Sequence, residues 1–146
     1  MNKIYIAAPL FSESELIFNK RISDLLSSYL DVYLPQQDGD LLVDLVNRGM
    51  NEICARKKIF SQDVEAIDRS DFVLAVFDGR SIDEGACFEL GYAFAKGKAC
   101  FGFQTDPRRL LNGGNNPMID EAVIRTFYST SELTEWARGT NVVNIG

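Results

Sequence analysis

A single carboxylate, Glu89, lies inside the apolar and aromatic run CFELGYAFA at residues 87–95. An ionised carboxylate is costly to bury without a partner, because removing its charge from water is strongly unfavourable. Helical neighbours that could neutralise Glu89 would lie three or four residues away, and none of those positions carries a positive charge. An unpaired carboxylate of this kind is a candidate nucleophile.

Two aspartates accompany Glu89 in the sequence. Asp83 precedes it by six residues at the expected start of the same helix, and Asp63 lies on the preceding expected helix. Glycosyl transfer needs paired carboxylates, because one attacks or stabilises the anomeric carbon while others hold or protonate neighbouring groups. Small neighbours such as Gly85 leave room for a substrate above the helix. We therefore expect a dry, ionised Glu89 beside a sugar.

Ordinary interpretations fit the same residues. Glutamates on helices commonly lie on solvated faces, and Asp83 in a first helical turn complements the helix dipole. A tyrosine in a buried strand, such as Tyr5, is typical of a protein core. Gln36 and Gln37 are common turn residues, as is Asn116 before a proline. Residue spacing alone leaves the function undecided.

Short apolar runs alternate with helical patterns along the chain. Helix starts are indicated by two capping-box patterns, Ser12 with Glu15 and Ser81 with Glu84. Strands are expected over 3–8, 31–34, 72–77, 99–103 and 124–128. Helices are expected from 12 to about 29, over 82–96 and over 130–138, and a helix or broken helix over about 40–69. This alternation predicts an α/β domain, a doubly wound parallel sheet over residues 1–146. Ligands of such sheets bind beyond the carboxyl ends of the strands, where the polar loops of this chain converge.

Composition excludes several classes of protein. A net charge of −6 and a pI near 4.6 argue against binding a nucleic acid polymer, and no apolar run is long enough to span a membrane. The chain has no histidine, so Ser-His-Asp triads and most zinc sites are excluded. Phosphate-binding glycine motifs are missing too, so no nucleotide cofactor is expected. Three cysteines without CxxC spacing favour a reducing, cytoplasmic setting.

Four segments together resemble the nucleoside 2-deoxyribosyltransferase family. They are KIYIAAPLF, PQQDG, DVEAIDRSDFVLAVFDGRSIDEGACFELGYA and NNPMI, spread over residues 3–119. The third segment is the most specific, since it joins an aspartate to a glutamate six residues later in an ELGYA helix. The resemblance implies a flavodoxin-like three-layer sandwich with a five-stranded parallel sheet, and it requires no metal and no organic cofactor.

The resemblance also implies roles for individual residues. Glu89 matches the nucleophile, and Tyr5 matches the tyrosine that orients it. Asp83 matches the aspartate that binds the deoxyribose hydroxyls, while Asp63 matches the one that meets the nucleobase and assists its protonation. Phe11 would wall the pocket.

Two further contacts follow from the same resemblance. Gln36 or Gln37 is expected to recognise the base. Asn116, with Asn115 as the alternative, matches the asparagine that reaches the 5′-hydroxyl in the site of a neighbouring subunit. A homo-oligomer is therefore implied, with deoxynucleosides and nucleobases as its small-molecule partners.

The implied reaction, a step of nucleotide salvage, is transfer of 2-deoxyribose between bases by retaining double displacement through a covalent glutamate ester. The nearest alternative is a 2′-deoxynucleoside 5′-phosphate N-hydrolase, which shares the glutamate and needs a phosphate subsite. Ser81, Arg80 and Arg108 are candidates for that subsite, whereas Asp83 would repel a phosphate dianion. A third possibility is a non-enzymatic binding module in which Glu89 only lines a pocket.

Overall fold

The computed structural model describes residues 1–108 and 113–140. Within these residues five parallel strands form one sheet in the order β2-β1-β3-β4-β5. The strands are β1 (Lys3–Ala7), β2 (Asp31–Tyr33), β3 (Phe72–Val76), β4 (Ala99–Phe103) and β5 (Arg125–Phe127). This architecture confirms the predicted α/β doubly wound sheet, and each strand agrees with its expected range to within one residue at either end.

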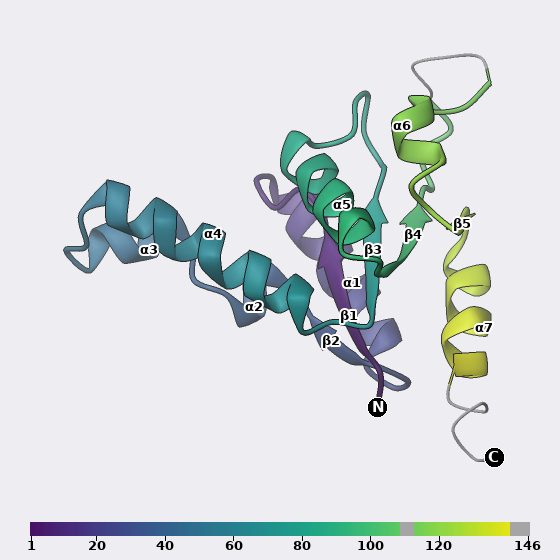
Figure 1. Cartoon of the computed structure of the whole chain (residues 1–146), viewed down its shortest axis with the longest axis horizontal. Coiled ribbons are helices and arrows are strands. Elements are labelled where there is room, and N and C mark those ends of the chain that lie inside the picture. The colour runs from purple at the N-terminus through teal and green to yellow at the C-terminus, as the bar shows by residue number, and fades with distance from the viewer. Residues whose placement is uncertain (109–112, 141–146) are drawn as a thin grey trace.

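Helices connect the strands and cover the sheet. They are α1 (Glu13–Leu26), α2 (Pro35–Asp38), α3 (Leu42–Asn47), α4 (Glu52–Asp68), α5 (Glu84–Ala95), α6 (Pro117–Asp120) and α7 (Thr130–Thr140). The α3 helix and the first part of α4 extend away from the sheet as a hairpin (Figure 1). Among the helices of the described ranges, none combines the length and apolarity of a membrane span.

Alternate residues of each strand feed two separate cores. Ile4 and Ile6 of β1 belong to a cluster that includes the inner faces of α1 and α7. Tyr5 and Ala7 point to the opposite face, where residues of α4 and α5 pack, Leu90 among them. The period-two alternation of a strand therefore delivers Tyr5 to the layer that contains the Glu89 helix.

Helix ends differ from the expectations in two places. The PQQDG segment begins with the short helix α2 rather than a turn, because Pro35 suits a first helical turn and Asp38 accepts a hydrogen bond from the backbone N of Leu34 at 2.7 Å. Of the helix or broken helix expected over 40–69, the structure has the broken form, α3 and α4, with Gly49 at a φ of 93° between them. The Ser81–Glu84 capping box is wrong, since Asp83 itself caps α5.

Gly102 of β4 lies in close contact with the aromatic ring of Phe77. A Cβ at this position would overlap the Phe77 ring and lie 2.7 Å from Thr126 Oγ1. We expect Gly102→Ala to lower the free energy of unfolding by about 1–3 kcal/mol, because an added methyl group overpacks the core. Gly91 of α5 is the matched control, since a Cβ there meets nothing within 4 Å, and Gly91→Ala should stabilise by about 0.5–1 kcal/mol. Urea unfolding of both variants tests this; equal stability of Gly102→Ala and wild type would contradict it.

Candidate active site

The strand order reverses between β1 and β3, and ligands of doubly wound sheets bind beyond the strand ends at such a reversal. Two cavities open there, of about 410 and 240 Å³, and together they are called the cleft below. Both are lined by Leu42, Ile59, Asp63, Gly85 and Glu89. The larger lies between α4 and α5, and the smaller reaches the loops that follow β1 and β2. Concave, mainly apolar sites with a few polar groups suit small-molecule ligands.

Glu89 is joined to the inner strand β1 by a hydrogen bond. Tyr5 is fully buried in β1, and its hydroxyl donates to Glu89 Oε1 at 2.9 Å. The Tyr5 ring stacks on Tyr33 of β2, with ring centroids 5.5 Å apart and planes inclined by 12°. A rigid core residue therefore fixes one carboxylate oxygen of a residue that borders both cavities.

The environment of the cleft shifts the pKa of two carboxyl groups. Desolvation raises the pKa of Glu89 to about 8, with the Tyr5 hydrogen bond acting in the opposite direction and the charges of Asp63 and Asp83 adding to the rise. Desolvation likewise raises the pKa of Asp63 to about 6. The expectation of an ionised Glu89 is therefore wrong for the free chain at neutral pH, because apolar walls stabilise the protonated form. Both carboxyl groups therefore ionise at a higher pH than they would in water.

Asp83 and Gly85 form the start of α5 at the edge of the smaller cavity. Asp83 Oδ2 accepts a hydrogen bond from the backbone N of Ala86 at 2.9 Å, so the aspartate is the N-cap of the helix. A Cβ at Gly85 would lie 3.0 Å from that same oxygen, so the glycine keeps the space beside Asp83 open. Phe11 lines the same cavity, and 80% of its side chain is exposed.

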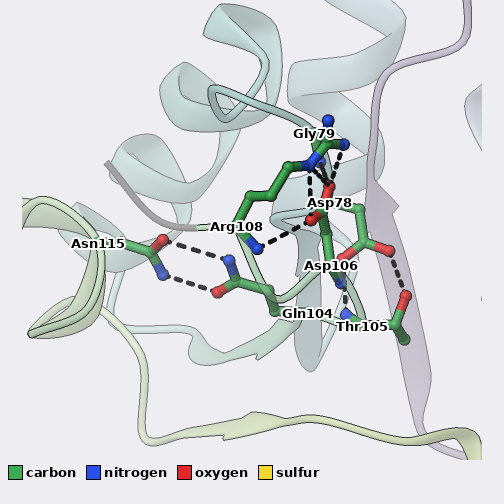
Figure 2. Close-up of polar contacts among 7 residues, drawn as sticks. All are labelled: Asp78, Gly79, Gln104, Thr105, Asp106, Arg108 and Asn115. Atoms are coloured by element: carbon green, nitrogen blue, oxygen red, sulfur yellow. Dashed lines mark hydrogen bonds and ion pairs between the residues drawn. The ribbon is translucent and has the colours of Figure 1, made fainter. Parts of the chain in front are cut away.

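Hydrogen bonds tie the loop after β3 to the loop after β4 (Figure 2). Asp78 Oδ1 accepts from the backbone N of Thr105 at 2.6 Å and of Asp106 at 2.9 Å. In return, Gly79 N donates to Asp106 Oδ2 at 3.2 Å. The tied loop leads directly to Asp83 and α5.

Comparison with known proteins now identifies the family. Residues 4–141 match the family described as nucleoside 2-deoxyribosyltransferase. The chain belongs to this family. The match confirms the resemblance that the sequence segments suggested.

Individual proteins are similar to this chain in sequence or in structure. An uncharacterized protein of Ureaplasma parvum is 31% identical over 96 residues, which are 64% of this chain and 60% of that protein, so the chain matches less than two thirds of its curated relative. A conserved protein from Enterococcus faecalis has a TM-score of 0.77 and 26% identity, covering 96% of this chain and 99% of that one. A 2-deoxyribosyltransferase from Bacillus psychrosaccharolyticus has a TM-score of 0.71 and 24% identity, covering 90% of each chain. The predicted flavodoxin-like layers are confirmed.

The structure does not bring the two predicted glutamines to the cleft. Gln36 Nε2 donates to the carbonyl oxygen of Leu16 at 2.9 Å, and Gln36 Oε1 accepts from Asn19 Nδ2 at 3.0 Å. Both ends of this amide therefore join α2 to α1. Gln37 is exposed and lines neither cavity.

The two asparagines before α6 also lie outside the cleft of their own chain. Asn116 is exposed, and its Oδ1 accepts from the backbone N of Met118 at 2.9 Å as the N-cap of α6. Asn115 Nδ2 donates to Gln104 Oε1 at 2.9 Å and to Asp120 Oδ1 at 3.1 Å, so it holds the loop together (Figure 2 shows the Gln104 contact). Of the two, Asn116 is the one on the surface.

Phe60 and Asp40 line the cleft and were not expected there from the sequence. Phe60 of α4 and Phe88 of α5 face each other in the larger cavity, with ring centroids 5.8 Å apart. Asp40, in the loop before α3, lines the smaller one. Phe60 precedes Asp63 by three residues, so helical spacing could have found it, whereas Asp40 gives no local signal. Within the described ranges, no three His, Cys, Asp or Glu side chains are grouped so as to hold a metal ion.

The raised pKa of Glu89 should make the stability of the protein depend on pH. The pKa rises from 4.5 to about 8 on folding, so the stabilisation is fully present below about pH 4.5 and is lost as pH rises to about 8. Glu89→Gln cannot ionise, and we expect it to flatten the decline between about pH 6 and 8, above the pKa of Asp63. Urea unfolding across this range measures the effect. Glu135→Gln, an exposed change on α7, should keep the wild-type slope; a flat wild-type curve would contradict the pKa shift.

Proposed function

We propose that this protein transfers 2-deoxyribose from a 2′-deoxynucleoside to an acceptor purine or pyrimidine base. One observation carries the proposal: Tyr5 donates to Glu89 at 2.9 Å in a cleft that Asp63 also lines, in a chain of the deoxyribosyltransferase family. Glycosyl transfer requires a carboxylate to attack the anomeric carbon and an acid to protonate the leaving group. We assign the first role to Glu89 and the second to Asp63.

In the first half-reaction Glu89 attacks C1′ of the deoxynucleoside. A bond forms between C1′ and a carboxylate oxygen as the C1′–N bond breaks, and the electron pair of the broken bond leaves with the base. The base takes up a proton from Asp63. Asp83 holds the sugar hydroxyls, and Tyr5 orients the attacking carboxylate. The product is a deoxyribosyl ester of Glu89 with inverted configuration at C1′.

In the second half-reaction an acceptor base occupies the place of the first. Its ring nitrogen attacks C1′, the bond to Glu89 breaks, and the carboxylate is regenerated. Asp63 regains a proton from the N–H of the acceptor. Two inversions give overall retention, and neither step of this proposal uses a cofactor.

Desolvation raises the pKa of both Glu89 and Asp63, so a proton is available in the cleft near neutral pH. The cycle starts with Glu89 ionised and Asp63 protonated. Moving that proton to Asp63 produces the nucleophile and the acid together. A base nitrogen beside Asp63 would accept a hydrogen bond from the protonated acid, so a bound nucleoside favours the reactive arrangement.

A second copy of the chain is part of the proposal. Phe11, Phe60 and Phe88 line the cleft, yet more than half of each side chain is exposed. Asn116 lies outside the cleft of its own chain, and we assign it to the 5′-hydroxyl in the cleft of a neighbouring copy. A copy docked there would also exclude water, which competes with the acceptor base for the ester.

Charges near the cleft favour a nucleoside over a nucleoside 5′-phosphate. Asp83 lines a hollow at the start of α5. The other charged residues of that hollow are Glu15, Asp78, Glu84 and Arg80. A phosphate dianion there would face four carboxylates and one guanidinium among the described residues, which is repulsive. The nucleotide hydrolase is therefore the less favoured of the two reactions.

Base exchange tests the proposed function. Incubation of 2′-deoxycytidine with free adenine should yield 2′-deoxyadenosine and cytosine. Chromatography of the reaction mixture measures both products. Glu89→Gln should lower the rate by about 10³-fold or more, because the nucleophile is lost, while the circular dichroism spectrum stays that of the wild type. Glu135→Gln, far from the cleft on α7, should retain the wild-type rate.

Two other results would overturn the proposal. Release of free sugar phosphate from a 2′-deoxynucleoside 5′-phosphate, without exchange of any base, would indicate the hydrolase. Binding of nucleosides with neither exchange nor hydrolysis would indicate a binding module.

A further inference from the structure

One acidic side chain of the cleft has no role in the reaction proposed above. Asp40 lies in the loop between α2 and α3 and lines the smaller cavity together with Asp63 and Glu89. Pro35, Leu41 and Leu42 line the same cavity, so Asp40 is the polar side chain that residues 35–42 bring to the cleft. It occupies the place that sequence analysis expected Gln36 or Gln37 to take.

Helix α4 holds Asp40 through one of its two carboxylate oxygens. Lys58 Nζ lies 2.8 Å from Asp40 Oδ2, and Gln62 Nε2 donates to the same oxygen at 2.9 Å. The hydrogen bond from Lys58 lowers the pKa of Asp40 most, and the one from Gln62 lowers it further. The carboxylate is therefore ionised at neutral pH. Among the described residues, none donates a hydrogen bond to Oδ1.

The contacts of Asp40 join it to the helix that carries Asp63. Lys58 and Gln62 are one helical turn apart on α4, and Asp63 follows on the same helix. Asp40 and Asp63 both line the smaller cavity, so Asp40 shares that cavity with the group that we assign to the nucleobase.

We infer that Asp40 selects nucleobases that carry an exocyclic amino group, as in 6-aminopurines and 4-aminopyrimidines. An ionised carboxylate only accepts hydrogen bonds, so its open oxygen suits the amino group of adenine or cytosine. The same oxygen faces the carbonyl oxygen of hypoxanthine or uracil with two acceptors and no proton between them. An amide at this position would accept and donate, and so would admit both classes of base. The inference rests on the proposed function, because it concerns the base of that reaction.

Two matched pairs of acceptor bases test the selection by Asp40. Adenine and hypoxanthine compete for deoxyribose from 2′-deoxycytidine, and cytosine and uracil compete for it from 2′-deoxyadenosine. In each pair that exchanges, kcat/KM for the amino base should exceed that for the oxo base by at least about tenfold, as expected for one charge-assisted hydrogen bond. Asp40→Asn should reduce each ratio to about threefold or less, raising the rate of the oxo base while lowering that of the amino base.

Asp38→Asn is the matched control for Asp40→Asn. Asp38 lies two residues away in the same segment, accepts from the backbone N of Leu34 at 2.7 Å and lines a separate hollow beside Arg69. We expect Asp38→Asn to leave both base ratios at their wild-type values. A merely structural role for Asp40 would lower the rates of all four bases alike and leave the ratios unchanged.

Each outcome of this experiment decides something. Wild-type ratios near one, or in favour of the oxo bases, overturn the inference even where Asp40→Asn does not fold, and they leave the proposed function intact. A wild-type preference that Asp40→Asn does not weaken also overturns the inference. Exchange with none of the four bases overturns the proposed function and this inference with it.

Discussion

The chemistry of this cleft depends on one hydrogen bond between a buried tyrosine and a partly buried carboxyl group. Tyr5 belongs to the inner strand β1 and Glu89 to helix α5, so the bond joins the buried sheet to the residue that we propose as the nucleophile. Two opposing effects meet at Glu89. Desolvation raises its pKa, and donation by Tyr5 lowers it, which leaves the group at about 8, within reach of ionisation near neutral pH. Without the tyrosine, burial alone would leave a carboxylic acid that is harder to ionise.

The other acids near Glu89 are accommodated in different ways. Asp83 accepts a backbone hydrogen bond at the start of its helix, and Asp40 pairs with Lys58 of α4. Among the described residues none donates a hydrogen bond to the Asp63 side chain, and desolvation raises its pKa to about 6. The acids therefore differ in proton affinity: hydrogen bonds lower the pKa of Asp40, while desolvation raises that of Glu89 and that of Asp63. A set of carboxyl groups with different proton affinities is what a reaction requires when it needs a nucleophile and an acid side by side.

Local sequence signals predicted the elements of the fold better than the contacts between them. The Ser12–Glu15 capping box is confirmed, since both of its hydrogen bonds are present. Each joins residues three apart in sequence, so a local pattern was enough to predict it. The run of apolar residues in β3 indicated a strand covered on both faces, and it is central in the sheet. Gln36 was expected at the base, but its partner Asn19 lies 17 residues earlier, so no local pattern shows that the amide is already engaged. The ionisation of Glu89 was misjudged for a related reason, since its pKa is set by how the surrounding helices pack.

The covalent ester on Glu89 is the central claim, and mass spectrometry of a trapped intermediate tests it most directly. A fluorinated 2′-deoxyribonucleoside reacts slowly enough for the ester to accumulate, after which the protein is digested and its peptides are weighed. We predict that the peptide containing Glu89 gains the mass of the fluorinated sugar, and that Glu89→Gln shows no such gain. Full turnover without any sugar-bearing peptide, or a sugar attached to a different residue, would contradict the account.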